Sequence, residues 1–139
     1  MYKKILVAND GSEEAFKALS AAVDLALCND AELHMIIVEE IPRFPGSIDE
    51  VKGEIELADI RFAPVVSRSK KLAAARGLSL QCHVLPGHAA STLVEFCRKR
   101  AFDLLVTGFT RHSALYNRVL GSAADRLVDL APCTVMVIK

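Results

Sequence analysis

The chain has 139 residues, 52% of them hydrophobic, and its 17 basic residues balance its 17 acidic ones. This length favours a single domain over residues 1–139, and the balanced charge argues against a nucleic-acid partner. Any anion must therefore be bound by local geometry. The apolar runs are too short for a membrane span or a signal peptide, so we expect a soluble, cytoplasmic protein without membrane attachment.

The first predicted elements are a strand, a helix and a second strand. A compact apolar run over residues 3–8 predicts a buried strand, which "NDGS" ends. Apolar positions three and four apart after Ser12 predict an amphipathic helix, begun by a Ser or Asp cap and by Glu13 and Glu14. Residues 31–40 are expected to form the second strand. The segment 41–47 has two prolines and a glycine, which is typical of a loop.

The rest of the chain repeats this alternation. An apolar stripe from Val51 to about Arg76 predicts a long helix, which Pro64 should kink or split and Gly77 should stop. The remaining elements are expected as strands over 78–85, 102–108 and 133–139, and as helices over 89–101 and from Gly121 to about Leu130. Strands that alternate with helices predict an α/β fold, an open five-stranded parallel sheet with helices on both faces, Rossmann-like.

Two polar segments follow the first and fourth predicted strands, where sheets of this kind bind ligands. They are "NDGS" and "TGFTRHSALYNRVLGS", residues 107–122. Asp10 in the first could contact a ribose, hold a metal through a phosphate, or cap the first helix. In the second, Gly121 and Ser122 begin a helix, whose unpaired N–H groups suit a phosphate. Ser122 could equally do no more than cap that helix.

The loop between these glycines is basic. Gly108 closes the apolar strand, where it could admit a ligand or only make a turn. Arg111, His112 and Arg118 follow it and could contact phosphates or form a solvated loop surface. The residues therefore allow a phosphate site without requiring one.

Motifs for catalysis or for a protein-held metal are absent from the sequence. It has no HExxH, GxSxG, P-loop or GxGxxG after the first strand, so no reaction can be assigned. His34 and His83 lie on predicted strands and are expected to be structural. The cysteines form no CxxC pair and are expected to be mostly buried small hydrophobes: Cys28, Cys82, Cys97 and Cys133.

Nearly the whole chain resembles a single-domain universal stress protein. "KKILVANDGSEEAFKAL" is similar to the opening of that family, and "FDLLVTG", "LGS" and "APCTVMVIK" are similar to its closing segment. Nucleotide-binding members carry a glycine, two residues, a second glycine, nine residues, and then Gly-Ser or Gly-Thr. Here Gly108, Gly121 and Ser122 fit this spacing, whereas Arg111 occupies the second glycine position.

The resemblance implies an adenine nucleotide, ATP or AMP, with any Mg²⁺ held through its phosphates. It places Asp10 near the ribose and base, and the backbone of Val38 at the adenine edge. It also implies a homodimer formed by the last strand, residues 133–139, and that apolar strand would need a partner at a sheet edge. The residues expected around the phosphates are Gly108, Gly121, Ser122 and Ala123.

Arg111 leaves three functions open. A backbone conformation that needs glycine would cost an arginine about 1 kcal/mol or more. A guanidinium close to phosphates returns about 1.5–3 kcal/mol, so the substitution does not by itself abolish a site. We therefore expect a nucleotide-binding regulatory or stress-response protein. The alternatives are a dimeric adaptor that has lost the ligand and a slow ATPase; a phospho-receiver domain is set aside because Asp10 lacks the further acids that it needs.

Overall fold

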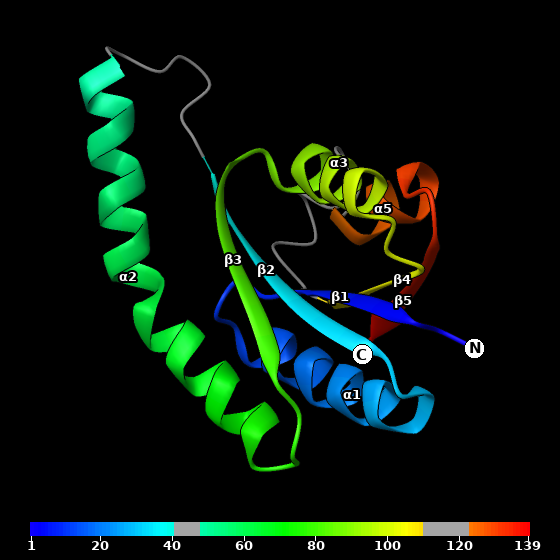
Figure 1. Cartoon of the computed structure of the whole chain (residues 1–139). Helices are drawn as coiled ribbons and strands as arrows, with labels where there is room; N and C mark the ends of the chain where they lie inside the picture. The colour runs from blue at the N-terminus through cyan, green and yellow to red at the C-terminus, as the bar shows by residue number, and fades with distance from the viewer. Residues whose placement is uncertain (41–47, 110–122) are drawn as a thin grey trace.

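The structure is a computed structural model that describes residues 1–40, 48–109 and 123–139 (Figure 1). All strand pairs are parallel, and the strand order is β3-β2-β1-β4-β5. The predicted α/β class and the five-stranded parallel sheet are thus confirmed. The strands are β1 (Lys4–Ala8), β2 (Glu32–Glu40), β3 (Leu80–Gly87), β4 (Leu104–Gly108) and β5 (Thr134–Ile138), and the helices are α1 (Glu13–Asn29), α2 (Ile48–Ala74), α3 (Ala89–Arg100) and α5 (Ala123–Leu130).

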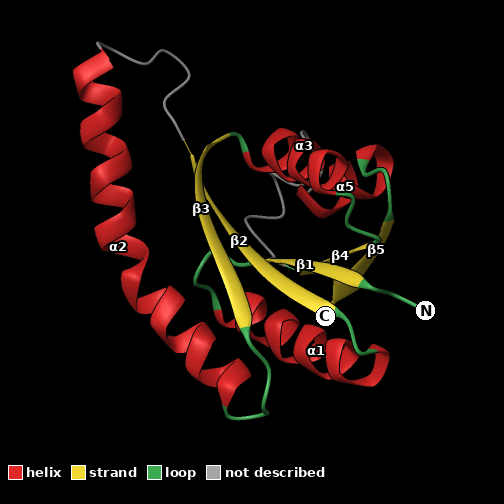
Figure 2. Cartoon of the chain, in the orientation of Figure 1, coloured by secondary structure: helices red, strands yellow, loops and turns green. Residues whose placement is uncertain are grey.

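Helices cover both faces of the sheet (Figure 2). Helices α1 and α2 pack on one face, around a buried cluster that includes Leu19, Val23 and Met35. Helices α3 and α5 pack on the other face, around a cluster that includes Leu93 and Leu127. Successive residues of β1 and β2 point into opposite clusters, which is why these strands are apolar along most of their length.

Helix α1 begins as its sequence predicts. Ser12 is the N-cap, and its hydroxyl accepts a hydrogen bond of 3.2 Å from the Ala15 N–H. Glu13 and Glu14 occupy the first turn, where carboxylates favour the positive end of the helix dipole. Asp30 ends the helix in the left-handed conformation, with φ of 52°.

Pro64 lies inside one continuous helix, α2. The predicted splitting of this helix is therefore wrong, whereas the predicted kink agrees with the bend that Figure 1 shows about midway along α2. After the helix, Gly77 takes a φ of +78°, as expected of a helix stop. The Leu78 N–H then donates 3.0 Å to the Ala73 carbonyl oxygen, which closes the turn into β3.

Strand β3 lies two residues further along the chain than predicted, because it continues through Pro86. Proline has no N–H to donate, and a sheet tolerates it mainly in edge strands. Among the described strands β3 pairs with β2 alone, so it can accept this residue. Pro86 and Gly87 are locally typical of a turn, which is why the strand was expected to end at residue 85.

The cysteines only partly follow expectation. Cys97 is buried, and its burial together with the adjacent Cys133 thiol raises its pKa to about 12. Cys82 and Cys133 are half-buried, and burial raises the pKa of each thiol. Cys28 is exposed on α1, so the expectation of burial fails for this cysteine.

Candidate functional site

The sheet has its switch point, the place where the strand order reverses, between β1 and β4. Val7 of β1 lies opposite Val106 of β4, so Asp10 and Gly108 follow this pair at neighbouring strand ends. Beyond β1 the chain enters α1 on one face of the sheet, and α5 lies on the other face. The carboxyl ends of β1 and β4 thus border the crevice in which open α/β sheets bind ligands.

The turn between β1 and α1 is held by its own side chains. Asn9 is buried, and its Oδ1 accepts 2.8 Å from the Gly11 N–H while its Nδ2 donates 3.3 Å to the Ser69 hydroxyl of α2. Gly11 has a φ of +89°, a conformation that favours glycine. Asp10 is exposed, and its Oδ1 accepts 2.9 Å from the Ser12 N–H. Ser12, not Asp10, caps the helix, so Asp10 is fixed in place with its carboxylate facing solvent.

Gly108 has a packing reason to be glycine. A Cβ at this position would lie 2.7 Å from the Glu14 carbonyl oxygen and 2.8 Å from its carbon, both in the first turn of α1. Real Cβ atoms do not approach a backbone so closely, so any other residue would push α1 away from β4. The sequence analysis offered only a turn or a ligand as reasons for this glycine.

The end of β2 carries three side chains with different environments. Val38 is half-buried and packs into the cluster beneath α3, opposite Leu85 of β3. Glu39 is 8% exposed and pairs with Arg61 of α2 on the other face. Sequence analysis missed this pair, which only the folded arrangement brings together.

Glu40 ends β2 and holds the start of α3. Its Oε1 accepts 2.9 Å from the Ala89 N–H, and its Oε2 lies 3.5 Å from His88 Nδ1. His88 is the N-cap residue of α3 and makes no side-chain cap bond within the described structure. A carboxylate from a neighbouring strand thus takes the role that a Ser or Asp cap takes elsewhere. Two adjacent acidic residues at the end of β2, Glu39 and Glu40, were the feature of the sequence that pointed to such a contact.

Several predicted site residues lie outside the described residues: Arg111, His112, Arg118, Gly121 and Ser122. Ala123 begins α5, the helix expected to follow the phosphate loop. Within the described ranges, no group of three His, Cys, Asp or Glu residues could hold a metal ion. No helix among the described residues is long and apolar enough to cross a membrane.

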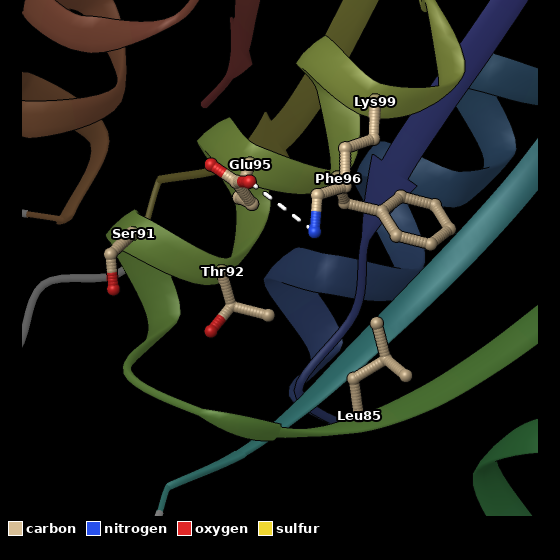
Figure 3. A pocket seen from close by; sticks show the side chains of 6 residues that line it. All are labelled: Leu85, Ser91, Thr92, Glu95, Phe96 and Lys99. Atoms are coloured by element: carbon tan, nitrogen blue, oxygen red, sulfur yellow. Dashed lines mark ion pairs between the residues drawn. The ribbon is translucent and has the colours of Figure 1, made fainter.

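A shallow hollow of about 420 Å³ lies elsewhere, between α3 and β3 (Figure 3). Leu85 and Phe96 supply its apolar wall, and Glu95 and Lys99 form an ion pair of 3.4 Å along α3. Ser91 and Thr92 complete the lining. It is separate from the Asp10 and Gly108 strand ends, so it adds nothing to the site at the switch point.

This geometry defines a doubly wound α/β protein with its candidate ligand crevice at a switch point. The universal stress protein family (Usp) matches residues 1–139, and the chain belongs to this family. It is 34% identical over 141 residues to the universal stress protein MJ0531 of Methanocaldococcus jannaschii, covering all of this chain and 83% of that protein. It is 28% identical over 151 residues to YxiE of Bacillus subtilis, covering the full length of both.

Solved structures agree on the fold. UspA from Lactobacillus plantarum superimposes with a TM-score of 0.83 at 25% identity, covering 99% of this chain and 98% of that one. A universal stress protein in complex with cAMP gives 0.80 at 21%, covering 99% and 97%. One from Archaeoglobus fulgidus in complex with dAMP gives 0.70 at 18%, covering 99% and 98%. At these last two identities the likeness shows the fold alone.

Proposed function

We propose that this protein binds an adenine nucleotide, ATP or AMP, at the carboxyl ends of β1, β2 and β4, and acts as a single-domain regulatory or stress-response module. The observation that carries the proposal is the adjacency of Asp10 and Gly108 at the switch point. Two proteins of the same fold were solved with adenine nucleotides, cAMP and dAMP. The MJ0531 relative supports membership in the family and gives no information on the ligand.

Each end of the nucleotide has a proposed partner in this chain. The exposed Asp10 carboxylate is already oriented by the Ser12 N–H, and it accepts from the ribose hydroxyls. The backbone of Val38, at the end of β2, meets the adenine edge. Around the phosphates we place Gly108, Arg111, Gly121, Ser122 and Ala123.

The packing of Gly108 changes what this residue says about the proposed site. Its missing Cβ is already required by the first turn of α1, so its glycine identity is not evidence of a ligand. Gly108 still supports the proposal by its place beside Asp10 at the switch point. The proposed phosphate contacts depend on Gly121 and Ser122, the two residues that precede α5 in the chain. Their N–H groups and the Ser122 hydroxyl supply the phosphate contacts.

Any Mg²⁺ arrives with the nucleotide. Hard divalent cations prefer oxygen ligands and keep bound waters, so phosphate oxygens suffice without a protein cage. The protein then contributes the nucleotide pocket, and the phosphates coordinate the ion.

The experiment compares ATP and AMP binding by calorimetry in the wild type, Arg111→Ala and Arg111→Gly. If Arg111 contacts phosphate, Arg111→Ala weakens ATP more than AMP, and the loss shrinks at high salt. If Arg111 instead blocks the cradle, Arg111→Gly strengthens binding. Arg98→Ala, which removes the same charge from the exposed end of α3, is the matched control. No binding in any variant would leave the adaptor function, and phosphate release from ATP would favour the slow ATPase.

We also propose a homodimer paired through residues 133–139. Strand β5 is an edge strand of the described sheet, and Val135, Met136, Val137 and Ile138 are only half-buried there. An apolar edge of this kind favours pairing with a second copy. A charge at Val137 should then give monomers in sedimentation, whereas a wild type that sediments as a monomer at micromolar concentration would refute the dimer.

A further inference from the structure

The amino-terminal halves of β2 and β3 carry three ionisable side chains in a row, here named the histidine chain: Glu32, His34 and His83. His34 is 2% exposed, yet its Nε2 lies 2.6 Å from Glu32 Oε1 and its Nδ1 lies 2.9 Å from His83 Nε2. Phe102 packs edge-on against His34, and Phe96 packs against His83. The expectation that both histidines are structural leaves this chain unexplained.

The number of protons decides whether the chain holds together. With Glu32 ionised and both rings neutral, His34 donates from Nε2 to Glu32 and accepts at Nδ1 from the His83 Nε2–H. One added proton preserves both bonds, because a cationic ring still donates to a neutral one. A second proton places an N–H on each side of the 2.9 Å contact, and that hydrogen bond is lost.

Charged groups on the surrounding elements act on this balance. Glu32, on β2, is the anion at one end, and Gln81 of β3 also donates 3.2 Å to its Oε1. Lys4 of β1 and Arg100 of α3 act on His83 as positive charges, and Lys4 also acts on Glu32. Burial first, and then the charges of His34, Arg100 and Lys4, lower the pKa of His83 below 6.5.

We propose that the histidine chain is a proton-responsive element that ties edge strand β3 to β2 while it holds one extra proton or none, and that releases this tie when it takes up a second. The tie matters because β3 has no other strand partner among the described residues. Its release loosens β3 together with α3, whose Phe96 packs on the His83 ring. The core strand β1 is not loosened.

The direction of the pH effect follows from the pKa of His83. A depressed pKa in the folded state means that the unfolded chain binds the proton more readily. The stability contributed by His83 is therefore fully present above pH 6.5 and is lost as the pH falls from 6.5 through the lower pKa of the folded state. The hydrogen bond from His34 lowers the pKa of Glu32 below 4.5, so its contribution is lost only in more acidic solution.

Amide hydrogen exchange tests the proposal, with His83→Gln as the matched variant. A glutamine amide can donate to His34 or accept from it, but it does not become charged. Between pH 7.5 and 5.0 and after correction for intrinsic rates, protection of β3 relative to β1 should fall in the wild type. It should stay constant in His83→Gln. An equal fall in both proteins would overturn the proposal.

Two further variants guard against a general acid effect. His88→Gln removes an exposed histidine and should behave as the wild type does. Glu32→Gln keeps an acceptor for His34 but removes the anion that favours proton uptake by the chain, so loosening of β3 should begin at lower pH. In ring NMR the His83 signals of the wild type should change over the same pH range as the protection of β3. A change of the His83 signals with constant β3 protection, or an unchanged onset in Glu32→Gln, would contradict the mechanism.

Discussion

Polar side chains find their hydrogen-bond partners in different ways at the two ends of the parallel strands. At the carboxyl ends of β1 and β4, polar side chains are satisfied mainly by nearby backbone, as Asp10 is by the Ser12 N–H and Asn9 by the Gly11 N–H. In the amino-terminal halves of β2 and β3, side chains satisfy one another, as His34 does with Glu32 and His83. Side chains held by the backbone keep a fixed geometry that a ligand can use. The side chains of the histidine chain bond to one another, so their contacts respond to protons.

The largest expected effect on stability comes from a steric clash at the carboxyl end of β4. Gly108→Ala places a Cβ against the backbone of Glu14, so the free energy of unfolding should fall by about 2–3 kcal/mol. Gly53→Ala in α2 is the control, because a Cβ there meets nothing within 4 Å among the described residues. It should raise stability by about 0.5–1 kcal/mol. Equal effects in urea denaturation would mean that Gly108 is not pressed against α1.

Asn9→Ala should be next in size. It removes a buried amide that joins the Gly11 turn to Ser69, so we expect a loss of about 2 kcal/mol. Ser69→Ala removes only the second of these contacts and should cost less. A double-mutant cycle in chemical denaturation measures the coupling between Asn9 and Ser69. Additive losses would show that this hydrogen bond contributes nothing of its own.

Ser12→Ala should cost about 1 kcal/mol, the usual effect of losing an N-cap. The Ala15 N–H then has no side-chain acceptor at the start of α1. Ser12→Asp retains an acceptor and should stay close to the wild type in thermal unfolding. If Ser12→Asp is as unstable as Ser12→Ala, the serine has a role other than capping.

Asp10→Ala should have the smallest effect on stability. This variant distinguishes the proposed role of Asp10 in ligand binding from its role in the turn. Asp10 is exposed and makes one turn hydrogen bond, so unfolding should change by about 0.5 kcal/mol or less. Its proposed ribose contact should nevertheless lower ATP affinity about tenfold in calorimetry. A normal affinity in a normally folded variant would remove Asp10 from the proposed site.

Elements with a local signal were predicted well from the sequence. Helix α1 follows from its apolar period and its Ser12 cap, and the nearness of Asp10 to Gly108 follows from alternating strands and helices. Strand β3 was misplaced because Pro86 has the local signature of a turn, and only its position at the sheet edge makes it acceptable. Local sequence carries no information on which strand lies outermost.

The parts of the site that sequence could not supply depend on contacts between distant residues. The carboxylate of Glu40 meets the start of α3 across 49 positions of chain, and Gly108 meets the backbone of α1. Neither leaves a motif, because each needs only one residue of the right size or charge. The pairing of His34 with His83 was hidden for the same reason.

Pro86 also bears on the symmetry of assembly. A sheet with two receptive edges can add copies head to tail without end, which produces filaments rather than closed oligomers. Here one outer strand contains an exposed proline that offers no N–H to a newcomer, while β5 at the opposite edge contains no proline. A strand added at β3 would lack one hydrogen bond, which disfavours growth in that direction. Pairing through β5 alone can only be isologous, and it ends at two subunits.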